Sequence, residues 1–266
     1  MTMTIWTLTC QTMLMTLLCH NITKWFEKQR DMRKLFVAMM LLMTVSLHAH
    51  YYVVCVGISD YSGRLRNLRV SANDALTIQK IYVANGHADV RCLTDKDATV
   101  ENVKRAMNQT FSKAKSDDVV IFFFSGHGNS HGYCCYDQTL FYYEVTMALM
   151  NCKAKNKVVM ADACLAGNMR TSGVEEDANG KKVKNVMFFL SSRSGESSLE
   201  SRYANSMFTI YLERGLRGGA DTNLDKKLTA KEMYDFVHNG VIEMSRGEQH
   251  PVMWGNFNKN MVLIKW

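Results

Sequence analysis

The sequence predicts an α/β fold in which a mostly parallel central sheet of about six strands is covered by helices on both faces. Strand-like runs that are apolar throughout alternate along the chain with amphipathic stretches of helical period. This alternation is typical of parallel sheets that are buried between two helix layers. The chain has 266 residues, 47% of them hydrophobic, and can therefore bury one large core.

Four apolar runs are predicted to be strands, because each is rich in β-branched or aromatic residues. They cover residues 51–57, 119–125, 157–163 and 185–191. A shorter strand is expected at residues 89–93, and a last one near the C-terminus.

Helices are predicted where apolar residues recur at helical spacing. Ser71 is the candidate N-cap of the first helix. Tyr142 and Tyr143, near the start of the third, are expected in the core. The predicted helices cover residues 70–84, 99–115, 144–152, 206–215 and 229–244.

The N-terminal region differs from the rest of the chain. A basic start at Met32 precedes an apolar run of 11 residues and the small residue Ala49, which is the layout of a secretory signal peptide. The run is shorter than the roughly 20 residues that a membrane-spanning helix needs, although an anchor or a buried helix remains the alternative. We therefore predict an exported chain, periplasmic or secreted, whose mature form is not inserted in a membrane. The predicted parts are an upstream extension at 1–31, a signal peptide at 32–49 and one domain at 50–266.

Charge and cysteine spacing argue against two classes of function. The net charge is +7, but five of the basic residues and only two of the acidic ones precede His50, so the remainder carries +4. This excess is too small to indicate binding of nucleic acid, and no nucleic-acid motif is present. None of the eight cysteines forms a CxxC pair, so a zinc site is not expected. Several cysteines are expected to be small buried hydrophobes.

Two loops that follow predicted strands carry residues suited to nucleophilic catalysis. His127 lies between two glycines after residues 119–125, and Cys164 directly follows residues 157–163. A cysteine thiol needs a nearby imidazole or helix N-terminus to ionise at neutral pH. If the two strands are neighbours, both loops open at the same edge of the sheet. The backbone N–H groups of Gly128 and Cys164 are then candidate donors to an oxyanion.

Each residue alone has a plainer explanation. A cysteine at a strand end is usually buried for packing, and a histidine in a glycine loop is usually a satisfied polar group. The occurrence of both at strand ends of one parallel sheet favours catalysis.

Longer motifs around these residues resemble those of a known superfamily. FFFSGHG at residues 122–128 and VVMADACLAG at residues 158–167 resemble the histidine and cysteine motifs of caspases, metacaspases and paracaspases, in the same order. The resemblance covers about residues 51–266. It implies a caspase-like α/β sheet and a cysteine-type endopeptidase with a dyad of His127 and Cys164. Leu165 departs from the histidine of many metacaspases, at a position without an obligatory chemical role.

The resemblance also implies which residue precedes the cleaved bond, the P1 residue. Metacaspases and paracaspases carry acids that bind Arg or Lys, and Asp74 and Asp162 match the metacaspase positions. Two carboxylates that face one pocket would bind a guanidinium through charge-assisted hydrogen bonds. The plainer alternatives are a surface helix acid for Asp74 and a turn former for Asp162. We expect peptide or protein substrates with a basic P1 residue.

The segment at 168–185 is polar and lacks periodicity. It offers basic sites for self-processing, although an inert solvated loop is the alternative. We expect a monomer, as metacaspases tend to be. The rival to an enzyme is a catalytically silent caspase-like scaffold or binding domain, and a third option is another cysteine hydrolase with the same type of sheet. The candidate processing residues are Arg170, Lys181, Lys182 and Lys184.

Residues 221–232 have the oxygen spacing of a calcium-binding loop. Lys226 stands where a glycine is expected, and Lys227 adds a second positive charge. A turn that caps the next helix, with Thr229 as N-cap and Glu232 completing a capping box, explains the pattern better. His131, four residues after His127, has no further metal ligand at suitable spacing. We predict no metal site and no required cofactor, and leave calcium open.

Overall fold

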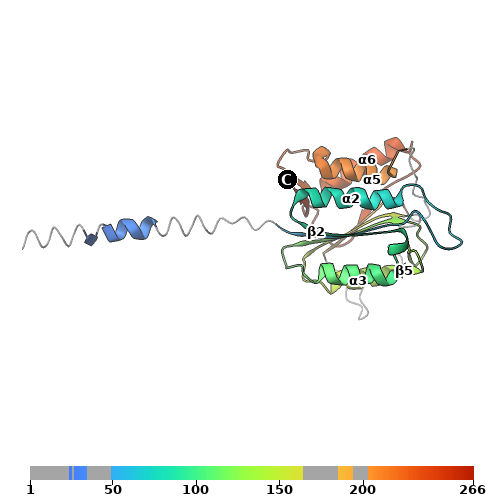
Figure 1. Ribbon diagram of the computed structural model, residues 1–266. Helices are drawn as coiled ribbons and strands as arrows, with labels where there is room; N and C mark the ends of the chain where they lie inside the picture. Colours follow the sequence, from blue (N-terminus) through green and yellow to red (C-terminus); the bar gives the residue numbers. More distant parts are fainter. Residues whose placement is uncertain (1–23, 26, 35–48, 164–184, 194–202) are drawn as a thin grey trace, which may run out of the picture. The chain divides into compact units, whose positions relative to one another are not determined.

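The computed structural model describes residues 24–25, 27–34, 49–163, 185–193 and 203–266 (Figure 1). The chain divides into two units, Met1–His48 and Ala49–Trp266. The described residues of the first unit are helical and exposed. Within the described ranges, no helix is long and apolar enough to cross a membrane. The apolar run of the predicted signal peptide lies outside these ranges, and the signal peptide stays a prediction.

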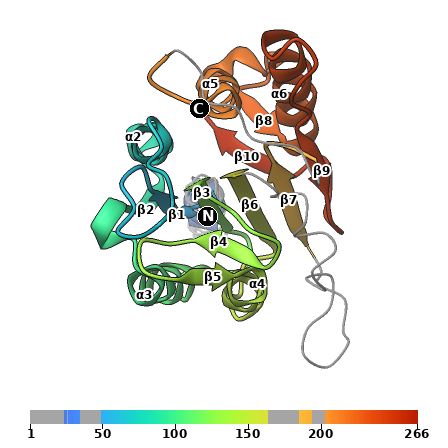
Figure 2. The same ribbon diagram turned by 90° about the vertical axis from the view of Figure 1, so that its right-hand side faces the viewer.

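The second unit is built on a six-stranded sheet with the order β2-β1-β3-β6-β7-β9 (Figure 2). All neighbouring pairs are parallel except β7 and β9, which are antiparallel. The central strands β1, β3, β6 and β7 are almost completely buried, as their apolar sequences predict. The strands of the sheet are β1 (Tyr51–Gly57), β2 (Ala88–Thr94), β3 (Val119–Gly126), β6 (Asn156–Ala163), β7 (Val186–Leu190) and β9 (Val252–Trp254).

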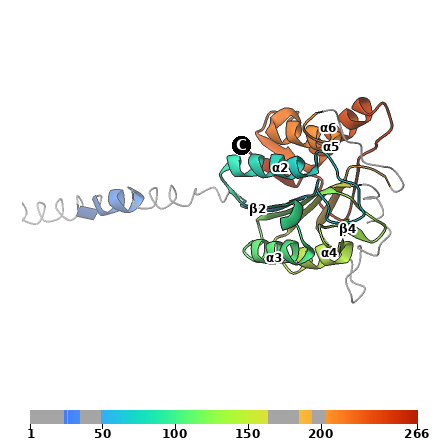
Figure 3. The same ribbon diagram turned by 45° about the vertical axis from the view of Figure 1, so that its right-hand side comes forward.

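Helices cover both faces of this sheet, so the predicted mostly parallel sheet between helix layers is confirmed. One layer holds α2 (Ser71–Asn85), α5 (Met207–Arg214) and α6 (Ala230–Met244), and the other holds α3 (Val100–Phe111) and α4 (Tyr142–Met150) (Figures 1 and 3). Two short helical turns complete the described helices: η1 (Asp95–Asp97) and η3 (Gly215–Gly219).

Each face of the sheet has its own hydrophobic core. Because successive strand side chains point to opposite faces, Phe122 and Phe124 pack toward α3 and α4, whereas Ile121 and Phe123 pack toward α2, α5 and α6. Four of the cysteines, Cys55, Cys134, Cys135 and Cys152, are buried and free. They behave as the small apolar residues that the sequence analysis expected.

Two small sheets flank the main one and were not predicted. β4 (Gly132–Cys134) pairs with β5 (Thr139–Phe141) beside α3 and α4 (Figure 2). β8 (Lys227–Thr229) pairs with β10 (Val262–Lys265). The sequence analysis expected one strand near the C-terminus, and the structure has both β9 and β10 there.

The predicted N-cap of the first helix is wrong. The N-cap of α2 is Val70, whose side chain makes no capping hydrogen bond, and Ser71 is already the first helical residue. The hydroxyl of Ser59, in the loop before the helix, instead accepts the N–H of Ala72 at 2.9 Å. A tertiary contact therefore satisfies a backbone donor that the sequence analysis assigned to a local cap.

Candidate active site

The ends of β3 and β6 define the candidate site. These strands are parallel neighbours, and their last residues, Gly126 and Ala163, are register partners. His127 directly follows β3, and Cys164 is the next residue after β6 in the sequence. Cys164 lies outside the described residues. The described parts of β3 and β6 thus end at the same edge of the sheet, which is the arrangement that the sequence analysis required of these two strands.

The backbone around His127 fixes how its imidazole is presented. The ring atom Nε2 lies 2.7 Å from the carbonyl oxygen of Arg66. A carbonyl only accepts hydrogen bonds, so this contact assigns the proton to Nε2 in the neutral ring and leaves Nδ1 as a proton acceptor. Arg66 belongs to the loop between β1 and α2, which therefore orients the histidine.

Tyr61 from the same loop holds the His127 segment from a second side. Its Oη accepts the backbone N–H of His127 at 2.7 Å, and the two rings lie 5.0 Å apart between centroids. Burial raises the pKa of Tyr61 well above its ordinary value, so the hydroxyl stays neutral. A Cβ at Gly126 would lie 2.6 Å from this Oη, so a glycine there permits the close approach of the tyrosine.

The Gly128 amide is available to a ligand. Gly128 forms an isolated antiparallel bridge with Tyr133, and the hydrogen bonds around this bridge use Cys134 N with His127 O, and Asn129 N with Gly132 O. The N–H of Gly128 takes part in neither bond. Among the described residues it has no hydrogen-bond partner, which suits the predicted role as a donor to an oxyanion.

The two predicted substrate-binding acids come together below this edge. Asp74 on α2 is 0% exposed and Asp162 near the end of β6 is 4% exposed. The surface-acid alternative for Asp74 is therefore wrong. The close approach of α2 to β1 brings Asp74 here: a Cβ at Gly57 would lie 2.3 Å from the carbonyl oxygen of Ser71, so only glycine allows it.

Neutral donors surround the Asp74 carboxylate. Ser125 Oγ donates to Oδ2 at 2.8 Å, while Asn205 Nδ2 and the backbone N–H of Ser206 donate to Oδ1 at 2.9 and 3.0 Å. Ser206 Oγ also donates to Oδ2 of Asp162. Burial, and next the negative charge of Asp162, raise the pKa of Asp74 to about 8, although these hydrogen bonds oppose the shift.

Sequence reasoning missed several residues of this site. Ser125 lay inside a quoted motif but had no role assigned to it. Tyr61, Asn205 and Ser206 were not considered, and nothing in their spacing marks them. The contribution of Arg66 is a backbone carbonyl, for which residue type carries no signal.

Other predicted residues lie outside the described ranges or apart from the site. The candidate processing residues Arg170, Lys181, Lys182 and Lys184 all fall within 164–184, which the structure does not describe. His131 is exposed. Within the described parts of the chain, no three His, Cys, Asp or Glu side chains are grouped to hold a metal ion.

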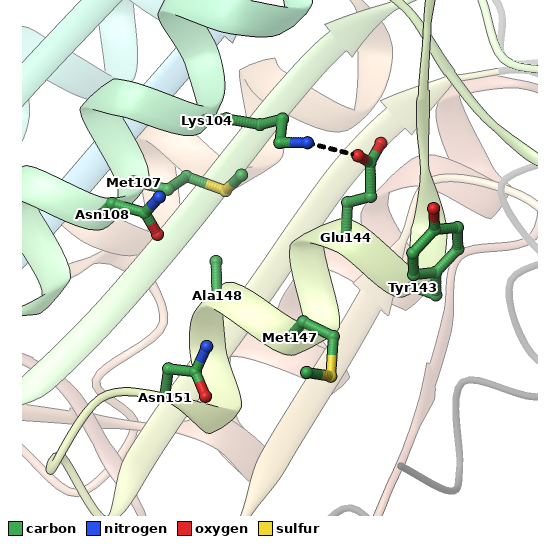
Figure 4. Close-up of a pocket in the computed structure, with 8 residues that line it drawn as sticks. All are labelled: Lys104, Met107, Asn108, Tyr143, Glu144, Met147, Ala148 and Asn151. Atoms are coloured by element: carbon green, nitrogen blue, oxygen red, sulfur yellow. Dashed lines mark hydrogen bonds and ion pairs between the residues drawn. The ribbon is translucent and has the colours of Figure 1, made fainter. Parts of the chain in front are cut away.

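A pocket between α3 and α4 contains none of the predicted site residues (Figure 4). The ion pair between Lys104 Nζ and Glu144 Oε1, at 2.6 Å, bridges the two helices there. Tyr142 is buried, as expected, but Tyr143 is 59% exposed and lines this pocket. The expectation for Tyr143 is wrong because its side chain leaves the helix on the solvent side.

The acidic turn before α6 forms the predicted cap. Thr229 is the N-cap: its hydroxyl accepts the N–H of Glu232, and the Glu232 carboxylate accepts the N–H of Thr229 at 3.0 Å. Partial burial of Glu232 raises its pKa, but hydrogen bonds from Thr229 and Thr222 outweigh this effect and lower it overall. In the turn itself, Asp221 Oδ2 accepts the N–H of Lys226 at 3.0 Å. The carboxylates of Asp221 and Glu232 thus accept hydrogen bonds from backbone N–H groups.

Comparison with known proteins identifies the fold. The model of the caspase domain, Peptidase_C14, matches residues 51–262. The structure is similar to that of protein GSU0716 from Geobacter sulfurreducens, with a TM-score of 0.61 and 17% sequence identity over 79% of this chain and 94% of that chain. At this identity the likeness concerns the fold alone. No curated protein sequence matches the chain.

Proposed function

Because this chain belongs to the caspase-domain family of cysteine peptidases, we propose that it is an active endopeptidase that cleaves peptide bonds after Arg or Lys. His127 and Cys164 form its catalytic dyad. The observation that supports the specificity is that Asp74 on α2 and Asp162 near the end of β6 are both buried and both accept hydrogen bonds from Ser206.

The proposed reaction follows from the orientation and protonation of the His127 imidazole. His127, with its Nε2 proton held by the Arg66 carbonyl, takes the proton of the Cys164 thiol on Nδ1. The thiolate attacks the scissile carbonyl carbon, and the oxyanion accepts hydrogen bonds from the N–H groups of Gly128 and Cys164. His127 then gives its proton to the leaving amine as the carbon–nitrogen bond breaks. A water molecule hydrolyses the remaining thioester, which releases the carboxylic acid and restores the thiol.

The acidic pair supports a cationic P1 side chain on electrostatic grounds. Two carboxyl groups that share a buried site raise each other's pKa, and a cation placed between them removes this repulsion. A guanidinium or ammonium can also donate hydrogen bonds to the carboxylate oxygens. An aspartate at P1 would add a third negative group and be rejected.

A set of peptides that differ only at P1 tests the proposal. We expect cleavage after Arg and Lys, no cleavage after Asp, and no cleavage by Cys164→Ala with any peptide. An electrophile with a basic P1 group would label Cys164 in the same protein. Faster cleavage after Asp would overturn the specificity. A wild-type protein that neither cleaves nor becomes labelled would instead support the silent scaffold.

We further propose self-processing within 168–185, where Arg170, Lys181, Lys182 and Lys184 are suitable P1 residues. This step follows from the proposed specificity and from the polar composition of the segment. Purified wild-type protein would yield fragments that Cys164→Ala lacks. The same fragments in both proteins would show that another protease makes them.

Export and a monomeric state complete the proposal. The signal peptide that begins near Met32 would be removed close to His50, so N-terminal sequencing of secreted or periplasmic material would start there, and an intact Met1 would refute export. Light scattering of the mature chain is expected to give the mass of one copy.

A further inference from the structure

Ser206 contacts both carboxylates of the proposed pocket. Its backbone N–H donates to Asp74 Oδ1 at 3.0 Å, and its hydroxyl donates to Asp162 Oδ2. The same hydroxyl oxygen accepts the N–H of Thr209 at 3.1 Å, because Ser206 is the N-cap of α5. One residue therefore joins α5 to the acidic side chains of α2 and β6.

Ser206 gives the two carboxylates different donors, a backbone N–H to Asp74 and a hydroxyl to Asp162. Asp74 accepts three hydrogen bonds, from Ser125, Asn205 and Ser206, which occupy three of its about four acceptor positions. It would keep two of them without the Ser206 contact. Asp162 accepts a hydrogen bond from the Ser206 hydroxyl, and the helix cap helps to fix the position of this hydroxyl because its oxygen also accepts the N–H of Thr209.

We propose that Ser206 is a specificity-determining residue, which positions the carboxylate of Asp162 for a basic P1 side chain. This inference rests on the proposed function and adds a residue that acts through Asp162. A hydroxyl donor favours the ionised carboxylate, and the N-terminus of α5 adds a favourable partial charge. The donor is neutral, so it supports the negative charge without occupying the pocket with a cation.

The Ser206→Ala variant tests this role through kinetics on peptides with Arg at P1. We expect the KM to rise about tenfold near neutral pH, which is the size expected for losing a hydrogen bond to a charged group, while kcat changes less than about twofold. Ser206→Thr, which retains the hydroxyl, is expected to restore the KM.

Thr99→Ala is the matched control. Thr99 is the N-cap of α3, and its hydroxyl accepts the N–H of Asn102 at 3.3 Å without any contact to a pocket residue. Both alanine variants lose a helix cap, and we expect both to melt at lower temperature. The KM is expected to change in Ser206→Ala alone.

A second measurement does not depend on catalysis. Calorimetry with arginine amide compares Cys164→Ala with the double variant that also carries Ser206→Ala, and we expect about tenfold weaker binding by the double variant. Equal binding, tighter binding, or an equal rise in KM in Thr99→Ala would overturn the role of Ser206 and leave the proposed function intact. Failure of arginine amide to bind either protein would overturn the basic pocket, and this inference with it.

Discussion

Replacing Asp74 by asparagine is expected to change how the stability of the fold depends on pH. The substitution removes a charge from a side chain that is 0% exposed and keeps its shape. The asparagine oxygen can still accept from Asn205 and Ser206, and its amide can donate to the hydroxyl of Ser125, which can rotate. We therefore expect Asp74→Asn to fold.

The size of the effect follows from the pKa of Asp74, which is raised from the ordinary value of 3.8 to about 8. The folded chain binds this proton more tightly than the unfolded chain does. The resulting stabilisation is complete below 3.8 and is lost as the pH rises to about 8. Each pH unit in this window is worth about 1.4 kcal/mol, so wild type would lose at most roughly 4 kcal/mol between about pH 5 and pH 8. Because the charge of Asp162 is one cause of the raised pKa of Asp74, this figure is an upper bound for Asp74 alone.

Urea denaturation followed by tryptophan fluorescence measures the difference. The free energy of unfolding of wild type is expected to fall relative to that of Asp74→Asn, by at most about 4 kcal/mol, between about pH 5 and pH 8. Asp117→Asn is the control, because Asp117 is an exposed acid in a surface ion pair with Lys155. Parallel pH dependences of wild type and Asp74→Asn, or a difference of opposite sign, would refute the description of Asp74 as a destabilised buried carboxylate.

Two further predictions concern the catalytic loop and the acidic turn. Tyr61→Phe keeps the ring but removes the oxygen that accepts the N–H of His127. We therefore expect kcat to fall about tenfold with little change in KM. An unchanged kcat in a peptidase assay would show that the hydroxyl does not position the loop. Titration with calcium in a calorimeter is expected to give no binding heat. Asp221 and Glu232 already accept backbone N–H groups, and Lys226 and Lys227 repel a cation. A saturable heat that disappears in Glu232→Gln would establish a calcium site instead.

The sheet could be predicted because a strand that is buried on both faces needs apolar side chains along its whole length. The run at residues 51–57 is apolar at nearly every position, and β1 has the predicted bounds. The β4–β5 pair could not be predicted, because strands of three residues are too short to show a periodic pattern. Helix ends also escaped prediction where a tertiary contact replaced a local one, as Ser59 does at α2.

Some residues of the candidate site could likewise be predicted from the sequence, and others could not. Residues next to strand ends, such as His127, could be placed because strand direction and pairing decide where they emerge. The surroundings of Asp74 could not, because Asn205 and Ser206 are separated from it by 131 and 132 residues in the chain. Local composition carries no information about contacts between residues so far apart. Asn205 and Ser206 reach Asp74 only because α2 and α5 pack on the same face of the sheet.

The linkage of Asp74, Asp162 and Ser206 has a consequence for the order of events during synthesis. The three residues are spread over half of the chain, and the last of them belongs to a helix that follows the sheet's central strands. A growing chain that has already made β3 and β6 still lacks the serine that joins the two acids. A newly made chain can therefore complete the proposed acidic pocket only after Ser206 has been synthesised and α5 has packed on the sheet.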